Sequence, residues 1–173
     1  MKTRKPSIPP FSRIADSIRR SVATVADHEL KKFAVEMRDF MRDGIRRQRF
    51  PSFQAYPLSR GYMEWKKSVG LDRRVLIATG QYVNNIVYRK IRRGVYEVNV
   101  PENIAARDKD GRPVGVTLRV LGAIHEIGSA AAQVPPRRHW RDGIAHAEQR
   151  AQEVAQAVAV EAARQVRRET GLE

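Results

Sequence analysis

The feature that most constrains the fold is a long run of apolar residues, spaced three and four positions apart, in the N-terminal third of the chain. This spacing places them on one face of an α-helix and the charged residues on the other. Ser12 is a suitable N-cap and Pro51 stops helical structure, so the pattern predicts one amphipathic helix over residues 12–49. Its apolar positions are Ile14, Ile18, Val22, Val25, Leu30, Phe33, Met37, Phe40, Met41 and Ile45.

A second helical pattern occupies residues 136–170, and Gly171 is a suitable stop. Alanine dominates this segment, which favours helical structure and lets another helix approach closely. We expect it to pack against the N-terminal helix, against a sheet, or against its copy in another subunit. Its apolar seam consists of Ile144, Ala147, Ala151, Val154, Val158, Ala162 and Val166.

Between the helices, residues 76–135 form a strand-rich module in which β-branched and aromatic residues alternate with polar ones. The fold class is therefore α+β: a long N-terminal helix, a small antiparallel β-sheet with a hairpin, and a long Ala-rich C-terminal helix packed on it. The predicted segments are strands at 86–91, 95–100 and 114–120, a turn at 92–94, an exposed loop at 101–113, and at 121–127 a continued strand or a short helix.

The length of 173 residues suits a single domain, predicted over residues 12–173, preceded by a flexible basic arm over 1–11. Residues 50–75 are predicted to be an aromatic loop region with one or two helical turns near 59–67. Its aromatic side chains either stack on nucleic-acid bases or pin the loop to the core.

A formal net charge of +14 is the strongest compositional signal, and the excess is concentrated in residues 1–60. Such an excess favours a polyanion as neighbour, although a basic surface without a specific ligand fits equally. The chain has no cysteine, which excludes disulfides and thiolate metal sites. No apolar run reaches the length of a membrane span and no signal peptide precedes the first helix, so no membrane partner is expected.

The residue pattern does not point to an enzyme, a metal or a cofactor. His125-Glu126 matches half of a zinc-peptidase signature, but position 129 is serine where the second histidine belongs. There is no glycine-rich phosphate loop and no serine elbow, and the carboxylates are scattered along the helices. We therefore predict a protein that is not an enzyme and carries no cofactor.

Four short segments follow one another in a telling order: Pro57-Leu58-Ser59 with Tyr62 and Lys66, then Leu76-Ile77-Ala78-Thr79-Gly80 with Ile86, then His125-Glu126-Ile127-Gly128, then Val134-Pro135-Pro136-Arg137. This order resembles that of the tail-completion or head–tail joining proteins of tailed bacteriophages, also called virion morphogenesis proteins. The family shows Leu-x-x-Thr-Gly-x-Leu, His-Glu-aromatic-Gly and Pro-x-Arg-Pro-Phe segments. The resemblance covers roughly residues 56–150, and the chain departs from it at Tyr82, at Ile127 and at Arg138-His139-Trp140.

The resemblance implies a structural virion protein that forms a ring in the head–tail connector and completes or joins the tail to the DNA-filled head. Expected partners are copies of the chain in a six-fold or twelve-fold ring, adjoining connector and tail proteins, and double-stranded DNA that passes through the lumen without sequence specificity. Expected subunit-docking residues, which either contact a neighbour or dock the last helix, are Arg137, Arg138, Trp140, Thr79, Gly80, His125 and Glu126. Expected DNA-facing residues, all on turns or loops, are Arg92, Arg93, Arg107, Lys109 and Arg112.

Two other functions fit the same sequence. A tail terminator that caps the tail tube would share most of these features. A basic nucleic-acid-binding accessory protein, with phosphate contacts along its long helix, would explain the charge without any virion role.

Overall fold

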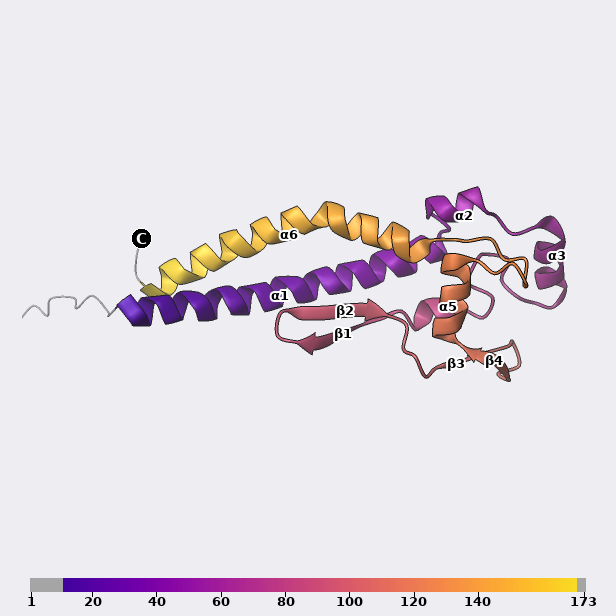
Figure 1. Cartoon of the computed structure of the whole chain (residues 1–173), viewed down its shortest axis with the longest axis horizontal. Coiled ribbons are helices and arrows are strands. Elements are labelled where there is room, and N and C mark those ends of the chain that lie inside the picture. The colour runs from indigo at the N-terminus through magenta and orange to yellow at the C-terminus, as the bar shows by residue number, and fades with distance from the viewer. Residues whose placement is uncertain (1–10, 171–173) are drawn as a thin grey trace, which may run out of the picture.

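Two long helices lie side by side in the computed structural model, which describes residues 11–170, and shorter elements gather at one end (Figure 1). The predicted α+β class is confirmed. We call the pair of long helices the stalk, and the end formed by α2–α5 with β3–β4 the head. In chain order the elements are α1 (Phe11–Arg46), α2 (Pro51–Ala55), α3 (Arg60–Ser68), α4 (Gln81–Asn84), β1 (Val87–Arg92), β2 (Val95–Asn99), β3 (Ala105–Arg107), β4 (Pro113–Thr117), α5 (Leu118–Ile127) and α6 (His139–Thr170).

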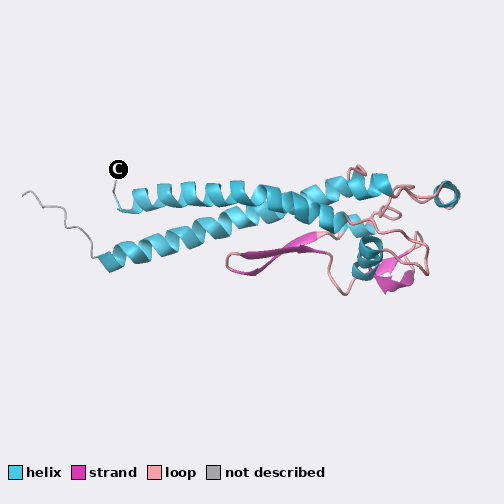
Figure 2. Ribbon diagram, turned by 45° about the horizontal axis from the view of Figure 1, so that its top comes forward, coloured by secondary structure: helices cyan, strands magenta, loops and turns pink. Residues whose placement is uncertain are grey.

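The stalk is an antiparallel pair, as both ribbon views show (Figures 1 and 2). The 36 residues of α1 span about 54 Å at the α-helical rise. Near the open end of the stalk, the Ser21 hydroxyl donates to a carboxylate oxygen of Glu169 at 2.8 Å. Further along, Arg150 Nε donates to Glu36 Oε1 at 2.9 Å. The last helix therefore packs against the first, one of the arrangements expected from its Ala-rich seam.

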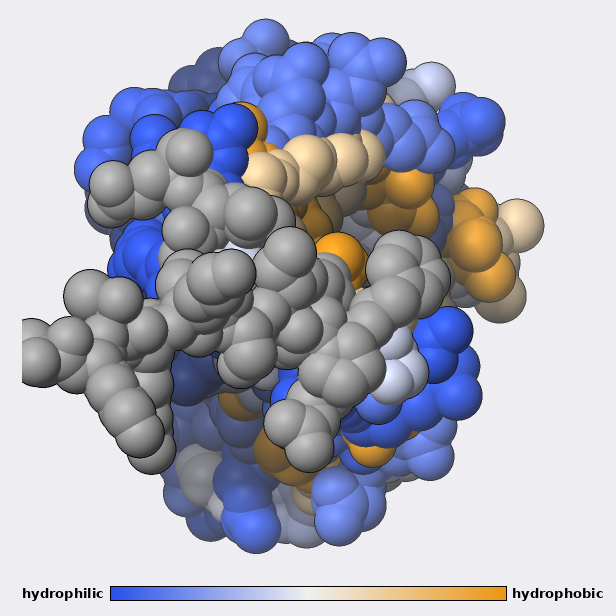
Figure 3. Space-filling view, turned by 90° about the vertical axis from the view of Figure 1, so that its left-hand side faces the viewer, coloured by the Kyte–Doolittle hydropathy of each residue, from blue (hydrophilic) through white to orange (hydrophobic). Residues whose placement is uncertain are grey.

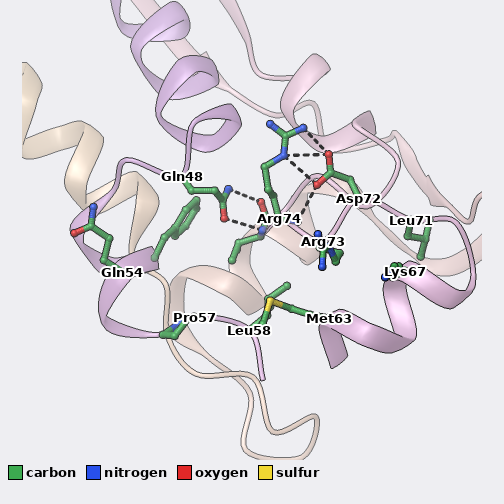
Figure 4. A pocket seen from close by; sticks show the side chains of 12 residues that line it. Gln48, Gln54, Pro57, Leu58, Met63, Lys67, Leu71, Asp72, Arg73 and Arg74 are labelled. Atoms are coloured by element: carbon green, nitrogen blue, oxygen red, sulfur yellow. Dashed lines mark hydrogen bonds and ion pairs between the residues drawn. The ribbon is translucent and has the colours of Figure 1, made fainter. Parts of the chain in front are cut away.

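Helix α1 ends three residues earlier than predicted, because Gln48 takes a left-handed conformation with φ of 55°. The amide of Arg49 bonds to the carbonyl of Gly44 and the amide of Gln48 to that of Ile45, which is the Schellman pattern of a helix end. The Gln48 side chain bonds both backbone groups of Val75, at 2.8 and 3.1 Å, and these bonds hold the turn (Figure 4). A glutamine at this position gives no sequence signal for a stop.

The predicted β-hairpin is present as β1 paired with β2, and it lies along α1 (Figure 1). Gly94, with φ of 71°, supplies the left-handed turn residue between the strands. The Asp27 carboxylate of α1 accepts the Gly94 amide at 2.8 Å and the Lys90 ammonium at 2.6 Å. These bonds hold the turn against the stalk and lower the pKa of Asp27, the backbone bond contributing most.

The third predicted strand is only partly right, and the sheet is not single. Residues 105–107, expected in a loop, pair with 113–117 as a separate two-stranded ribbon. The strand predicted to end at residue 120 stops at Thr117, whose hydroxyl accepts the Val120 amide at 3.3 Å and caps α5. Of the two possibilities for residues 121–127, the short helix is therefore observed.

The hydrophobic core lies where the stalk meets the head. It contains the last turns of α1 and side chains from most head elements, while the region predicted as an aromatic loop holds α2 and α3. The Ser59 hydroxyl accepts the Tyr62 amide and caps α3, which matches the helical turns predicted there. The buried core residues are Met41, Ile45, Phe50, Phe53, Val75, Leu76, Ile77, Tyr82, Val83, Ile86, Val100, Ala106 and Leu118.

Candidate functional site

Three of the segments that carry the family resemblance, and Tyr56 directly before the fourth, meet at the junction between α4, α5 and the start of α6. We call this group the junction cluster. One of its hydrogen bonds joins residues that are 81 positions apart in the sequence. Its members are Tyr56, Tyr82, His125, Glu126, Arg137, His139 and Trp140.

A chain of hydrogen bonds runs through the buried half of the junction cluster. The Trp140 indole N–H donates to the Tyr82 hydroxyl at 3.0 Å, and this hydroxyl lies 2.8 Å from His139 Nε2. His139 Nδ1 lies 3.0 Å from the Arg137 carbonyl oxygen, a pure acceptor, so the proton sits on Nδ1 and Nε2 accepts from Tyr82. Burial lowers the pKa of His139 to about 4 and raises that of Tyr82 well above its usual value. The network is therefore neutral at pH 7.

Glu126 fixes the direction of α6. Its two carboxylate oxygens accept the backbone amides of Trp140 and Arg141, at 2.9 and 3.1 Å. These amides belong to the first turn of the helix, where donors lack partners within the helix and a negative charge is favourable. The predicted site residue Glu126 thus acts within the chain, as the anchor of the last helix on α5.

Arg137 is buried, with 3% of its surface exposed. Its Nε donates to the Tyr56 carbonyl at 2.8 Å, and its Nη1 lies 3.4 Å from His125 Nδ1. Burial, followed by the charge of Arg137, lowers the pKa of His125 to about 3. The buried position corresponds to the second expected role of Arg137, docking of the last helix within its own chain. In contrast, Arg138 is exposed.

Thr79 and Gly80 set the backbone conformation that positions Tyr82. Gly80 has φ of 74° and stands as the N-cap of the short helix α4, where its left-handed backbone turns the chain. The Thr79 hydroxyl accepts the Gln81 amide at 3.4 Å. Tyr82 then points toward α5, where a Cβ added at Gly122 would collide with its ring. The glycine therefore lets the tyrosine reach the cluster.

The residues expected to face DNA form two groups. Arg92 and Arg93 lie at the end of the β1–β2 hairpin, where Arg93 also donates to the Thr24 hydroxyl of α1 at 2.8 Å. The other three lie at the β3–β4 turn of the head, which is far from the hairpin turn in the ribbon view (Figure 1). Arg107, expected in a loop, is the last residue of β3. These three are Arg107, Lys109 and Arg112, and all are exposed.

Two further observations concern metal ions and membranes. Within residues 11–170, no three histidine, aspartate or glutamate side chains gather as they would around a metal ion. In the same part of the chain, no helix is both long enough and apolar enough to cross a bilayer. Within the junction cluster, Glu126 accepts the first amides of α6, and the buried Arg137 guanidinium donates to the Tyr56 carbonyl.

Comparisons with known proteins give no identification. No protein-family model matches the chain, no curated protein matches it, and no solved structure matches its fold.

Sequence reasoning missed three members of the junction cluster, Tyr56, Tyr82 and His139. Tyr82 and His139 are departures from the family pattern, at positions where leucine and proline are usual. The structure pairs the two departures directly, at 2.8 Å. The sequence did contain a signal for this pair: in two of the motifs a polar residue replaces an apolar one. A buried polar group needs a hydrogen-bond partner, so each of the two residues was a candidate partner for the other.

Proposed function

We propose that this chain is a structural protein of a tailed-phage virion, which forms a ring at the neck and completes or joins the tail to the DNA-filled head. The observation that carries the proposal is the convergence of the resembling segments. Three of the segments that resemble the family, and the residue that precedes the fourth, contact one another in one cluster, as expected if they form a single structural unit.

The shape of the molecule supports a role in assembly. Apolar side chains remain exposed along the stalk, including Ile18 at 40%, Val22 at 41% and Val160 at 51%. Viewed from the open end of the stalk, apolar residues emerge between hydrophilic surfaces (Figure 3). Exposed apolar surface of this kind is typical of surfaces that contact other proteins.

A groove on the side of the stalk offers a second surface for a neighbouring copy. It lies between α1, the hairpin and α6, has a volume of about 480 Å³, and is lined by Phe33, Met37, Tyr96 and Ile144 among others. A groove on one side of an elongated subunit suits heterologous contacts, and such contacts close into rings when the rotation allows.

The charge distribution is compatible with passage of DNA through the ring. Exposed arginines occupy two separate turns, so each would meet phosphates as an isolated contact. Scattered contacts favour loose, sequence-independent attraction, which a channel for moving DNA requires.

A basic nucleic-acid-binding accessory protein is the second candidate, and the net charge of +14 favours it. Light scattering coupled to size-exclusion chromatography separates the two proposals. A neck protein is expected to assemble into rings, alone or when mixed with connector and tail parts. A stable monomer that binds duplex DNA with a steep salt dependence, and binds no virion part, would support the accessory protein instead. Binding to isolated tail tubes but not to heads would favour a tail terminator.

A further inference from the structure

Two cations are buried next to each other without a counter-charge. Lys66 is 2% exposed and Arg137 is 3% exposed. The Lys66 ammonium donates to the carbonyl oxygen of Arg74 at 2.7 Å, and Arg137 Nε donates to that of Tyr56 at 2.8 Å. Within the described part of the chain neither forms an ion pair, so both charges rest on neutral acceptors.

Two acids of the head, Asp72 and Glu126, are engaged with other groups. Asp72 is held by the Arg74 guanidinium, with two contacts of 3.0 Å, as Figure 4 shows. Glu126 accepts the first amides of α6. Burial lowers the pKa of Lys66 despite the attraction of Asp72, and the charge of Arg137 lowers it further. A buried cation without a partner is costly, which makes this arrangement incomplete in the isolated chain.

A cavity opens beside Lys66. It has a volume of about 430 Å³ and lies between α3, α5 and the β3–β4 ribbon. Its walls are mainly apolar and include Leu58, Val114 and Leu121. Tyr62 and Trp65 also line it, with rings stacked at 5.3 Å and about half of each residue exposed. The cavity thus combines one buried charged side chain with an aromatic wall.

We propose that this cavity binds a carboxylate carried on an apolar segment of a partner polypeptide. The carboxylate meets the Lys66 ammonium, and the apolar flank packs on Tyr62 and Trp65. Asp108 and Asp110 also line the cavity, but Asp108 accepts two backbone amides and Asp110 pairs with Lys109. The Lys66 charge therefore selects an anion, and the apolar walls select one with an apolar neighbour over a hydrated phosphodiester. This binding does not depend on the proposed neck role, because it requires only a partner polypeptide that carries a carboxylate beside an apolar segment.

Small probes test the proposal on the full chain. Phenylacetate carries a carboxylate on an aromatic ring, phenylacetamide is its neutral counterpart, and inorganic phosphate is an anion without an apolar flank. Thermal unfolding is expected to shift upward with phenylacetate in a saturable way and to shift little with the other two. An equal response to phenylacetamide, or a stronger one to phosphate, would overturn the proposal.

A pair of adjacent lysines supplies the matched variants. Lys66→Met is expected to weaken phenylacetate binding about tenfold or more, and to raise the unfolding temperature of the free chain because the unpaired cation is gone. Lys67→Met changes an exposed neighbour and should leave binding unaltered. Unchanged phenylacetate binding in Lys66→Met would contradict the proposal. If that variant does not fold, the comparison of the three probes on the wild-type chain decides.

Discussion

At the scale of single residues, the Tyr82 hydroxyl is the centre of the junction cluster. It accepts from the Trp140 indole and donates to His139, so one oxygen links the short helix α4 to the first turn of α6. Because all three groups are buried or half-buried, each depends on the others for its hydrogen bonds.

Replacement of Tyr82 by phenylalanine should therefore lower the free energy of unfolding by about 1–3 kcal/mol, since two partners lose their hydrogen bonds while the ring stays. Urea unfolding followed by far-ultraviolet circular dichroism measures this. Tyr62→Phe is the control, because the Tyr62 side chain is half-exposed and its hydroxyl has no hydrogen-bond partner among residues 11–170. Equal stability of the two variants would show that the hydrogen-bond network does not stabilise the fold.

The buried histidines predict a dependence of stability on pH. Burial lowers the pKa of His139 to about 4 and that of His125 to about 3, whereas an unfolded histidine titrates near about 6.5. The unfolded chain therefore binds more protons between those values, and the free energy of unfolding falls as the pH drops through about 6.5 toward 4. Urea unfolding at several pH values across this window measures the slope.

Two variants test which histidine causes this dependence of stability on pH. His125→Gln should reduce the slope by about one proton, because the group that titrates only on unfolding is gone. His28→Gln replaces an exposed histidine on α1 and should leave the slope as in the wild-type chain. A slope that is unaltered in His125→Gln would mean that His125 takes up its proton in the folded state as readily as in the unfolded one.

At the scale of elements, the head depends on close approaches that only glycine allows. Gly122 of α5 lies against the Tyr82 ring, Gly143 of α6 against the Met41 sulfur, and Gly44 of α1 against Phe50. The last two hold the helices of the stalk and the α1–α2 connection at their observed distances. Small residues on helix faces thus set where the long helices meet the head.

Gly122→Ala should destabilise the chain by about 1–3 kcal/mol, because the added methyl group overlaps the buried tyrosine ring and forces it to move. Gly61→Ala is the matched control: this glycine also lies in a helix, α3, and nothing lies within 4 Å of an added Cβ. The control should be neutral or slightly stabilising, given the better helix propensity of alanine. Thermal unfolding compares the two, and equal melting temperatures would contradict the packing described.

The sequence predicted the elements that come from long periodic patterns. It did not predict the element ends that depend on single side chains. Both stalk helices and the β1–β2 hairpin follow from repeated spacing over many residues. The end of α1 depends on a left-handed Gln48, and the end of β4 on the cap formed by Thr117. Strand β3 has three residues, which is too short for an alternating pattern to be recognised.

The sequence predicted which residues belong to the candidate site better than it predicted where those residues lie. Thr79, Gly80, His125, Glu126, Arg137 and Trp140 were all selected, and the structure places them in or beside one cluster. What spacing could not reveal is that Arg137 lies inside the chain, since an arginine on a proline-flanked segment is normally exposed. Its burial depends on the Tyr56 carbonyl, 81 residues away.

At the scale of the whole molecule, the junction cluster joins stalk and head, while the stalk and the side groove keep apolar residues exposed. Under the proposed function, these exposed residues contact other copies of the chain. Substitution of Ile18 and Val22 by glutamate should weaken assembly and leave the monomer folded, because both side chains are partly exposed in the single chain. Light scattering measures the assembled mass, and circular dichroism checks the fold.

The most direct test of the proposed neck role is to locate the protein in a virion. Cryo-electron microscopy of tailed particles from a strain that encodes this chain would be combined with an antibody against it. The account predicts a closed ring of copies between the portal and the tail, with DNA in its lumen. Particles that lack the chain altogether, or an intact neck in particles from a strain without its gene, would contradict it.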